Sequence, residues 1–204
     1  MKGRKFVRAR KYDALAAAVA AALFCTPAAA NWQDEVSAFD QGRLARLDEA
    51  RAKGLAEAQA GRDIGAIRAV LDAERRPVSA DKLRGEWRCR TMKLGGATPD
   101  IVYSWFRCRV SERGDRLFFE KESGSQRLQG YLYPHESGDY VLLGGLSAKG
   151  EPPHAYSGNG PSAGAGTTPD DAVGLLVSTG RGSARVELPY PGAESTFDVI
   201  EMKR

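Results

Sequence analysis

Hydrophobic and polar residues follow two different periods along this chain, and the period changes near residue 84. Before that point, apolar residues recur at helical spacing between charged ones, in a stripe made of Leu44, Leu47, Leu55 and Ala58. After it, short runs rich in β-branched and aromatic residues are separated by Gly, Pro, Asp and Ser. The pattern therefore predicts a helical segment over 31–84 and a β-domain over 85–204.

The helical segment is interpreted as a hairpin of two helices that packs on the β-domain. Gly61 is placed to end the first helix, and Asp63 to cap the second. Ser79 is placed to cap a last short turn before the β-domain. Gly54, inside the first helix, is expected to weaken it by about 1 kcal/mol relative to alanine. The alternative interpretation is an arm that binds a protein partner.

The β-domain is expected to hold eight consecutive antiparallel strands. They are predicted near 86–94, 101–110, 115–121, 126–134, 139–147, 172–179, 183–188 and 195–203. Such a series favours a mainly β fold, an eight-stranded up-and-down barrel, with a β-sandwich as the alternative. Closure into a barrel would also remove exposed strand edges. The long loop over 147–171 contains four prolines, and loops of this length are usually functional or disordered.

The first thirty residues have the pattern of a secretory signal peptide. A basic stretch over 1–11 precedes an apolar run over 14–24, and three alanines over 28–30 follow. The apolar run is shorter than the roughly 20 residues that a membrane-spanning helix needs. We therefore predict cleavage between Ala30 and Asn31 and a periplasmic or secreted product that does not span a membrane.

Removing this leader changes the charge and the cysteine count. The leader holds six of the 30 basic residues and one of the 26 acidic residues, so the remaining chain has a net charge near −1. This balance gives no reason to expect a nucleic-acid partner. Cys25 leaves with the leader, and Cys89 and Cys108 remain as an even pair in an oxidising compartment. We predict a disulfide between them.

No set of residues with catalytic spacing stands out. Ser79 and Lys82 fit the S-x-x-K spacing of serine acyl-enzymes, but their partner motifs are missing and a helix cap explains the serine. His135 and His154 are too few for a metal site without acidic help. We therefore expect a non-enzymatic protein with no catalytic residues, no metal and no cofactor.

Aromatic residues are the candidates for a ligand pocket. Tyr103 and Trp105 alternate on one predicted strand, and Tyr131 and Tyr133 on another. Such side chains line a ligand cavity or fill the core of a small barrel. Arg127 and Lys93 would meet the acidic head group of a pocket ligand, or else lie solvated on the outer face.

Several segments together resemble an exported alphaproteobacterial family, the domain of unknown function 4893. They are Gly85-Glu86-Trp87-Arg88-Cys89-Arg90-Thr91, Tyr103-Ser104-Trp105-Phe106-Arg107-Cys108, Glu187-Leu188-Pro189-Tyr190-Pro191 and Ser195-Thr196-Phe197-Asp198-Val199-Ile200-Glu201. The resemblance covers essentially the whole chain after the leader. It implies location and architecture, but no activity.

The G-x-W signature of Gly85 and Trp87 also resembles the opening of lipocalin-like (calycin) barrels. In those barrels the tryptophan plugs one end, and a basic residue from the last strand covers it. The resemblance implies that Lys203 or Arg204 has this role here. The leading hypothesis is therefore an exported binder of a small hydrophobic or amphipathic ligand. The alternative is a module that binds an envelope protein or inhibits an enzyme.

Overall fold

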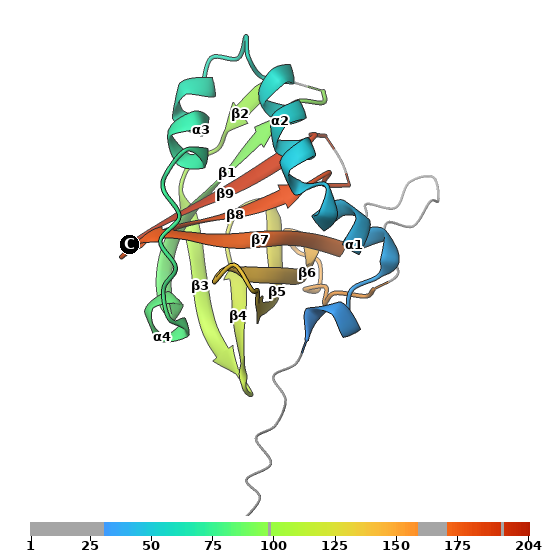
Figure 1. Ribbon diagram of the computed structural model, residues 1–204, viewed down its shortest axis with the longest axis vertical. Helices are drawn as coiled ribbons and strands as arrows, with labels where there is room; N and C mark the ends of the chain where they lie inside the picture. The colour runs from blue at the N-terminus through green and yellow to red at the C-terminus, as the bar shows by residue number, and fades with distance from the viewer. Residues whose placement is uncertain (1–30, 98, 159–170, 193) are drawn as a thin grey trace, which may run out of the picture.

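The computed structural model describes residues 31–97, 99–158, 171–192 and 194–204. The predicted leader over 1–30 lies outside the described residues, as does the 159–170 part of the long loop. A closed antiparallel barrel forms the body of the protein, with short helices on its outside (Figure 1). Within the described residues, no helix is long and apolar enough to cross a membrane.

Eight strands close the barrel and a ninth short strand extends it. The strands are β1 (Gly85–Leu94), β2 (Asp100–Val102), β3 (Phe106–Arg113), β4 (Arg116–Lys121), β5 (Gln126–Pro134), β6 (Tyr140–Ala148), β7 (Asp171–Gly180), β8 (Ser183–Pro189) and β9 (Phe197–Lys203). Neighbours in sequence pair in order from β3 to β9, and β9 returns to pair with β1. The predicted eight-stranded barrel is confirmed, and the sandwich alternative is not.

One predicted strand is divided in two. Residues 101–110 were expected to form a single strand, but residues 103–105 separate β2 from β3. The first half of β1 pairs with β3 and its last three residues pair with β2. The Tyr103 amide donates to the Thr91 carbonyl at 3.0 Å between the two ladders. The strand breaks because β1 changes partner at this point.

The barrel interior is filled along most of its length. Inward-facing positions alternate along each strand and form one apolar cluster, which includes Phe119, Leu142, Leu176 and Val186. Cys89 and Cys108 belong to this cluster and form the predicted disulfide, with Cα atoms 5.9 Å apart. They lie diagonally across the β1–β3 ladder, where Trp87 is opposite Cys108.

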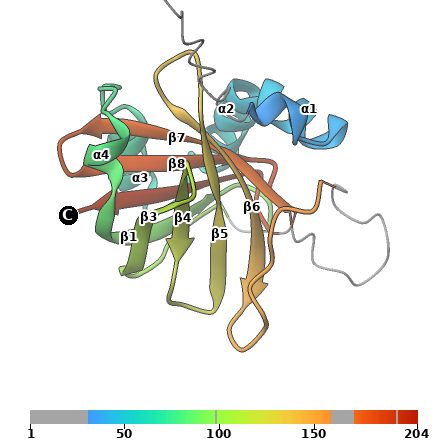
Figure 2. The same cartoon turned by 90° about the horizontal axis from the view of Figure 1, so that it is seen from below.

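Helices cover the outer face of several strands (Figures 1 and 2). They are the 3₁₀ turn η1 (Trp32–Asp34), α1 (Ala38–Ala45), α2 (Leu47–Glu57), α3 (Ile64–Leu71) and α4 (Ala80–Leu83). Apolar residues of α2 and α3 pack against β1 and β9, and those of η1 and α1 pack against β5, β6 and β7. The outer faces of these strands are therefore buried as well.

The helices differ in detail from the sequence prediction. The first expected helix is broken at Arg46 into α1 and α2. Asp63 and Ser79 occupy N-cap positions, but neither side chain makes a capping hydrogen bond. The Asp63 amide instead donates to the carboxylate of Asp100 at 2.8 Å, so the first residue of β2 satisfies this helix start.

Candidate functional site

One end of the barrel is closed by Trp87. Its indole nitrogen donates to the Leu83 carbonyl at 2.8 Å, and the Arg204 guanidinium lies 4.2 Å from the ring centroid. Arg204 also donates to the Leu83 carbonyl at 2.9 Å. Gly85 begins the strand with a φ of 125°, a conformation that favours glycine. Of the two basic residues expected to cover Trp87, Arg204 has this place, whereas Lys203 lies over Trp105.

Three of the four candidate pocket aromatics lie outside the barrel. Tyr131 packs edge-on against Phe118, and its ring lies 4.2 Å from the Arg116 guanidinium. Tyr133 is buried beneath the N-terminal residues and donates to the Glu35 carboxylate at 2.5 Å. Burial and this hydrogen bond raise the pKa of Tyr133. The contacts of Tyr133 pack the residues before α1 onto the barrel, and those of Tyr131 join β5 to β4.

Trp105 also lies on the outer face. The guanidinium groups of Arg90 and Arg88 lie 4.8 Å and 5.3 Å from its ring centroid. Tyr103 differs from the other three aromatics, because it borders a hollow of about 150 Å³ together with Thr91, Phe106 and Lys121. The four rings therefore do not share one pocket: alternation along β5 places Tyr131 and Tyr133 on the face away from the core, and Tyr103 and Trp105 lie in the break between β2 and β3.

A cavity lies at the barrel end opposite Trp87. Its volume is about 60 Å³. Its wall comes from the strand ends that meet there, and we call this region the mouth. Its apolar lining includes Leu128, Leu146, Ala172, Leu188 and Ile200, and its polar lining is Arg43, Thr91, Lys93, Lys121, Gln126, Arg127, Asp171 and Asp198. An apolar floor thus lies beneath a rim with several charges.

Lys93 has its countercharges within the mouth. Its amine donates to the Glu194 carboxylate at 2.6 Å. Burial alone would lower the pKa of Lys93, but Glu194 and Asp198 outweigh burial and raise it. Asp198 is itself buried, and burial raises its pKa to about 6 although Ser195 donates to it at 2.5 Å. Lys93 thus lies between two acidic side chains, and with both acids ionised this cluster has one negative charge in excess.

Lys121 and Arg127 differ from Lys93 in their hydrogen-bond partners. Lys121 is 6% exposed, and its amine donates to the carbonyls of Ser123 and Gln126 at 3.0 Å and 2.5 Å. Burial lowers the pKa of Lys121 to about 8, and the positive charge of Arg127 adds to the effect. The Nε atom of Arg127 is buried without a hydrogen-bond partner. Within the described residues, neither cation forms an ion pair with a carboxylate.

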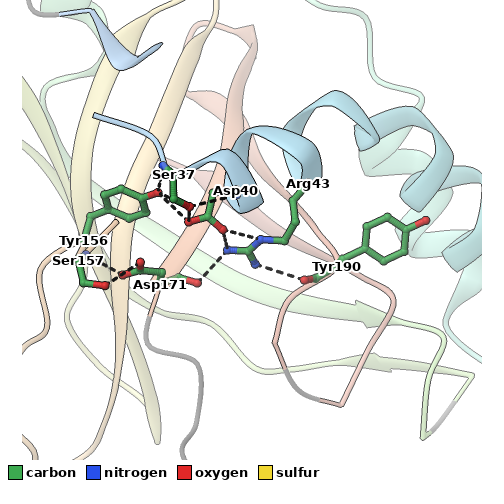
Figure 3. A network of polar contacts seen from close by, with 7 residues as sticks. All are labelled: Ser37, Asp40, Arg43, Tyr156, Ser157, Asp171 and Tyr190. Carbon is green, nitrogen blue, oxygen red and sulfur yellow. Dashed lines mark hydrogen bonds and ion pairs between the residues drawn. The ribbon is translucent and has the colours of Figure 1, made fainter. Parts of the chain in front are cut away.

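A buried polar network holds α1 against the mouth (Figure 3). The Arg43 guanidinium donates to Oδ1 of Asp40 from Nε at 2.9 Å and from Nη2 at 2.5 Å. It also donates to the carbonyls of Asp171 and Tyr190 at 3.1 Å and 3.2 Å. Arg43 therefore connects the helix to the start of β7 and to the loop after β8, and it forms part of the cavity wall.

The segment after β6 joins the same network. Tyr156 donates from its hydroxyl to Oδ2 of Asp40 at 2.7 Å, and Ser37 donates to the same oxygen at 2.9 Å. Burial and the Asp40 hydrogen bond raise the pKa of Tyr156 to about 12. The Asp171 carboxylate accepts from the amide and hydroxyl of Ser157 at 2.7 Å and 2.9 Å. Figure 3 shows these side chains converging between α1 and the adjoining loops.

The sequence from residue 32 to residue 202 matches a domain of unknown function, DUF4893. The chain belongs to the DUF4893 family. No solved structure and no curated protein matches the chain significantly. The fold and the mouth of this DUF4893 protein therefore supply the evidence from which its function is inferred.

Sequence reasoning on this DUF4893 protein named Lys93 and Arg127 as possible contacts for an acidic group, and both line the mouth. It missed Lys121, Asp198 and Arg43. A signal for Lys121 was present, because it has the same strand parity as the inward-facing Phe119. No group of three metal-ligating side chains was found among the described residues.

Proposed function

We propose that this protein is an exported, non-enzymatic binder of a small amphipathic ligand, which it holds in the mouth of the barrel. The observation that carries the proposal is the cavity with an apolar floor and a charged rim in a barrel that is otherwise filled. A ligand with a polar head and an apolar tail matches both surfaces. Pockets for small molecules commonly combine an apolar lining with a few placed polar groups.

The size of the cavity limits how much of the ligand is enclosed. At about 60 Å³ it is smaller than the roughly 150 Å³ cavity that holds a benzene molecule. A wider hollow of about 370 Å³ adjoins it and shares Lys121, Arg127 and Leu128 as lining residues. The enclosed part of the ligand is therefore a few carbon atoms, and the remainder extends along the rim.

Export and architecture belong to the same proposal. The signal-peptide pattern over 1–30 supports a periplasmic or secreted location. A disulfide between Cys89 and Cys108 supports an oxidising compartment. A relationship to lipocalin-like barrels is supported by the placement of Trp87 beneath Arg204 at the closed end.

Filling the cavity tests the proposal. Thr91 lines the cavity and also the hollow of about 150 Å³ next to it. The ring of Thr91→Phe is larger than the cavity, so it blocks the cavity and extends into this hollow, whereas Thr91→Val keeps the volume of the native side chain. Octanoate and octan-1-ol are titrated calorimetrically into the three proteins. We expect one-to-one binding of at least one compound to the wild type and to Thr91→Val, and none to Thr91→Phe.

Native mass spectrometry of protein purified from its own cells gives a second measurement. A bound compound that is absent from Thr91→Phe would support the proposal. Failure of both compounds to bind the wild type, together with no added mass in the native spectrum, would refute it.

A further inference from the structure

We infer that Lys121 and Arg127 recognise a carboxylate on the ligand of the mouth. This inference rests on the proposed function and specifies the chemical class of the ligand. The expected ligand is a monocarboxylic acid with a short apolar tail, with its head at the rim and its tail on the floor of the cavity.

The first argument is the balance of charge at the mouth. Arg43 forms an ion pair with Asp40, and Lys93 forms one with Glu194. The carboxylates of Asp171 and Asp198 also line the cavity, but within the described residues neither forms an ion pair with Lys121 or Arg127. These two neighbouring cations repel each other, and an anion between them reduces this repulsion.

The second argument is the unmet hydrogen bonding of these two side chains. The buried Nε of Arg127 has no acceptor, although a buried donor without a partner is costly. The Lys121 ammonium group donates two hydrogen bonds to backbone carbonyls, so one of its three N–H groups is left for a ligand. A carboxylate supplies two acceptor oxygens, and the planar guanidinium fork matches their geometry.

The third argument is that the two cations lie between the wider hollow and the apolar floor of the cavity. Lys121 and Arg127 both border the cavity and the wider hollow beside it. The side chains of Glu120 and Glu122 also line that hollow, so the head group lies where the two cations border the cavity. Leu128 follows Arg127 directly and belongs to the apolar floor. A head group held by the two cations therefore has apolar surface within reach of its first carbon atoms, which favours a carboxylic acid over a free inorganic anion.

The test compares ligands that differ only in the head group. Butanoate, hexanoate and octanoate are titrated against the alcohols of the same chain length. Because hydrogen bonds to a carboxylate are stronger than those to a neutral hydroxyl, we expect the wild type to prefer each acid by about tenfold or more. Arg127→Gln and Lys121→Met each lower this preference to near unity.

Arg68→Gln is the matched control. Arg68 is an exposed cation on α3, and its loss changes the net charge by the same amount without touching the mouth. We expect it to keep the full preference for the acid. The Lys121→Met result is used only if this variant shows the same cooperative unfolding transition as the wild type. Arg127→Gln keeps the test valid otherwise, because the Arg127 side chain forms no hydrogen bond within the described residues.

The outcomes separate the two proposals. Equal binding of acid and alcohol, blocked by Thr91→Phe, would overturn the carboxylate assignment and leave the mouth as a binding site. A preference for the acid that survives in both variants would also overturn it. Tighter binding of octyl phosphate than of octanoate would overturn the carboxylate class. Absence of binding by any compound would overturn the proposed function itself.

Discussion

Replacing Arg43 by methionine should destabilise the protein more than any exposed ion-pair variant. The Arg43 guanidinium makes two hydrogen bonds to Asp40 and two to backbone carbonyls, and its side chain is 3% exposed. Arg43→Met keeps most of the apolar length but leaves the fully buried Asp40 carboxylate without its countercharge. Breaking a buried pair in this way costs about 3–5 kcal/mol, against about 5–15 kcal/mol for the stability of a whole domain.

The free energy of unfolding is measured by urea titration of the oxidised protein. Arg76→Met is the control, because Arg76 and Glu74 form an ion pair of similar length with both side chains largely exposed. We expect it to cost about 0–1 kcal/mol. The double variant Asp40→Asn with Arg43→Met should recover part of the loss, because it removes the unpaired charge.

A loss in Arg43→Met no larger than that of Arg76→Met would refute this reasoning. It would mean that the network in Figure 3 positions α1 but adds little to the free energy of unfolding. A double variant no more stable than Arg43→Met would show that the lost carbonyl contacts, rather than the unpaired Asp40 carboxylate, cause the destabilisation.

Three further predictions concern stability. Burial raises the pKa of Asp198 in the folded protein from 3.8 to about 6, so wild-type stability should fall by up to about 3 kcal/mol as pH rises through this window. Asp198→Asn should lack that fall in urea titrations below and above the window. Replacing Cys89 and Cys108 by alanine should cost about 3 kcal/mol, because their bond closes a loop with a sequence separation of 19. Gly54→Ala should lower the melting temperature, whereas Gly65→Ala should raise it, because an added Cβ meets Phe197 at 2.9 Å only in the first case.

Each of these has a result that contradicts it. If the free energy of unfolding depends on pH in the same way in Asp198→Asn and the wild type, groups other than Asp198 cause the dependence. If the cysteine variant is as stable as the oxidised wild type, loop closure by the disulfide does not stabilise the protein. A more stable Gly54→Ala would show that α2 moves away from the sheet without cost.

The strand pattern could be predicted because alternation is a local property of the sequence. The features that were missed depend on contacts between distant residues. Gly54 was read as a weak point in a helix, but it allows α2 to approach Leu94 and Phe197 closely. Lys121 resembles any solvated lysine at a strand end, and its burial becomes evident only once the barrel is closed.

The pairing of β1 with β9 affects how this chain folds. The barrel is complete only when the last strand has joined the first, so every earlier intermediate leaves β1 and β8 with unpaired edges. Contacts between segments far apart in sequence slow folding, because loop closure must precede the stabilising contacts. The barrel therefore cannot close until its C-terminal strand is available.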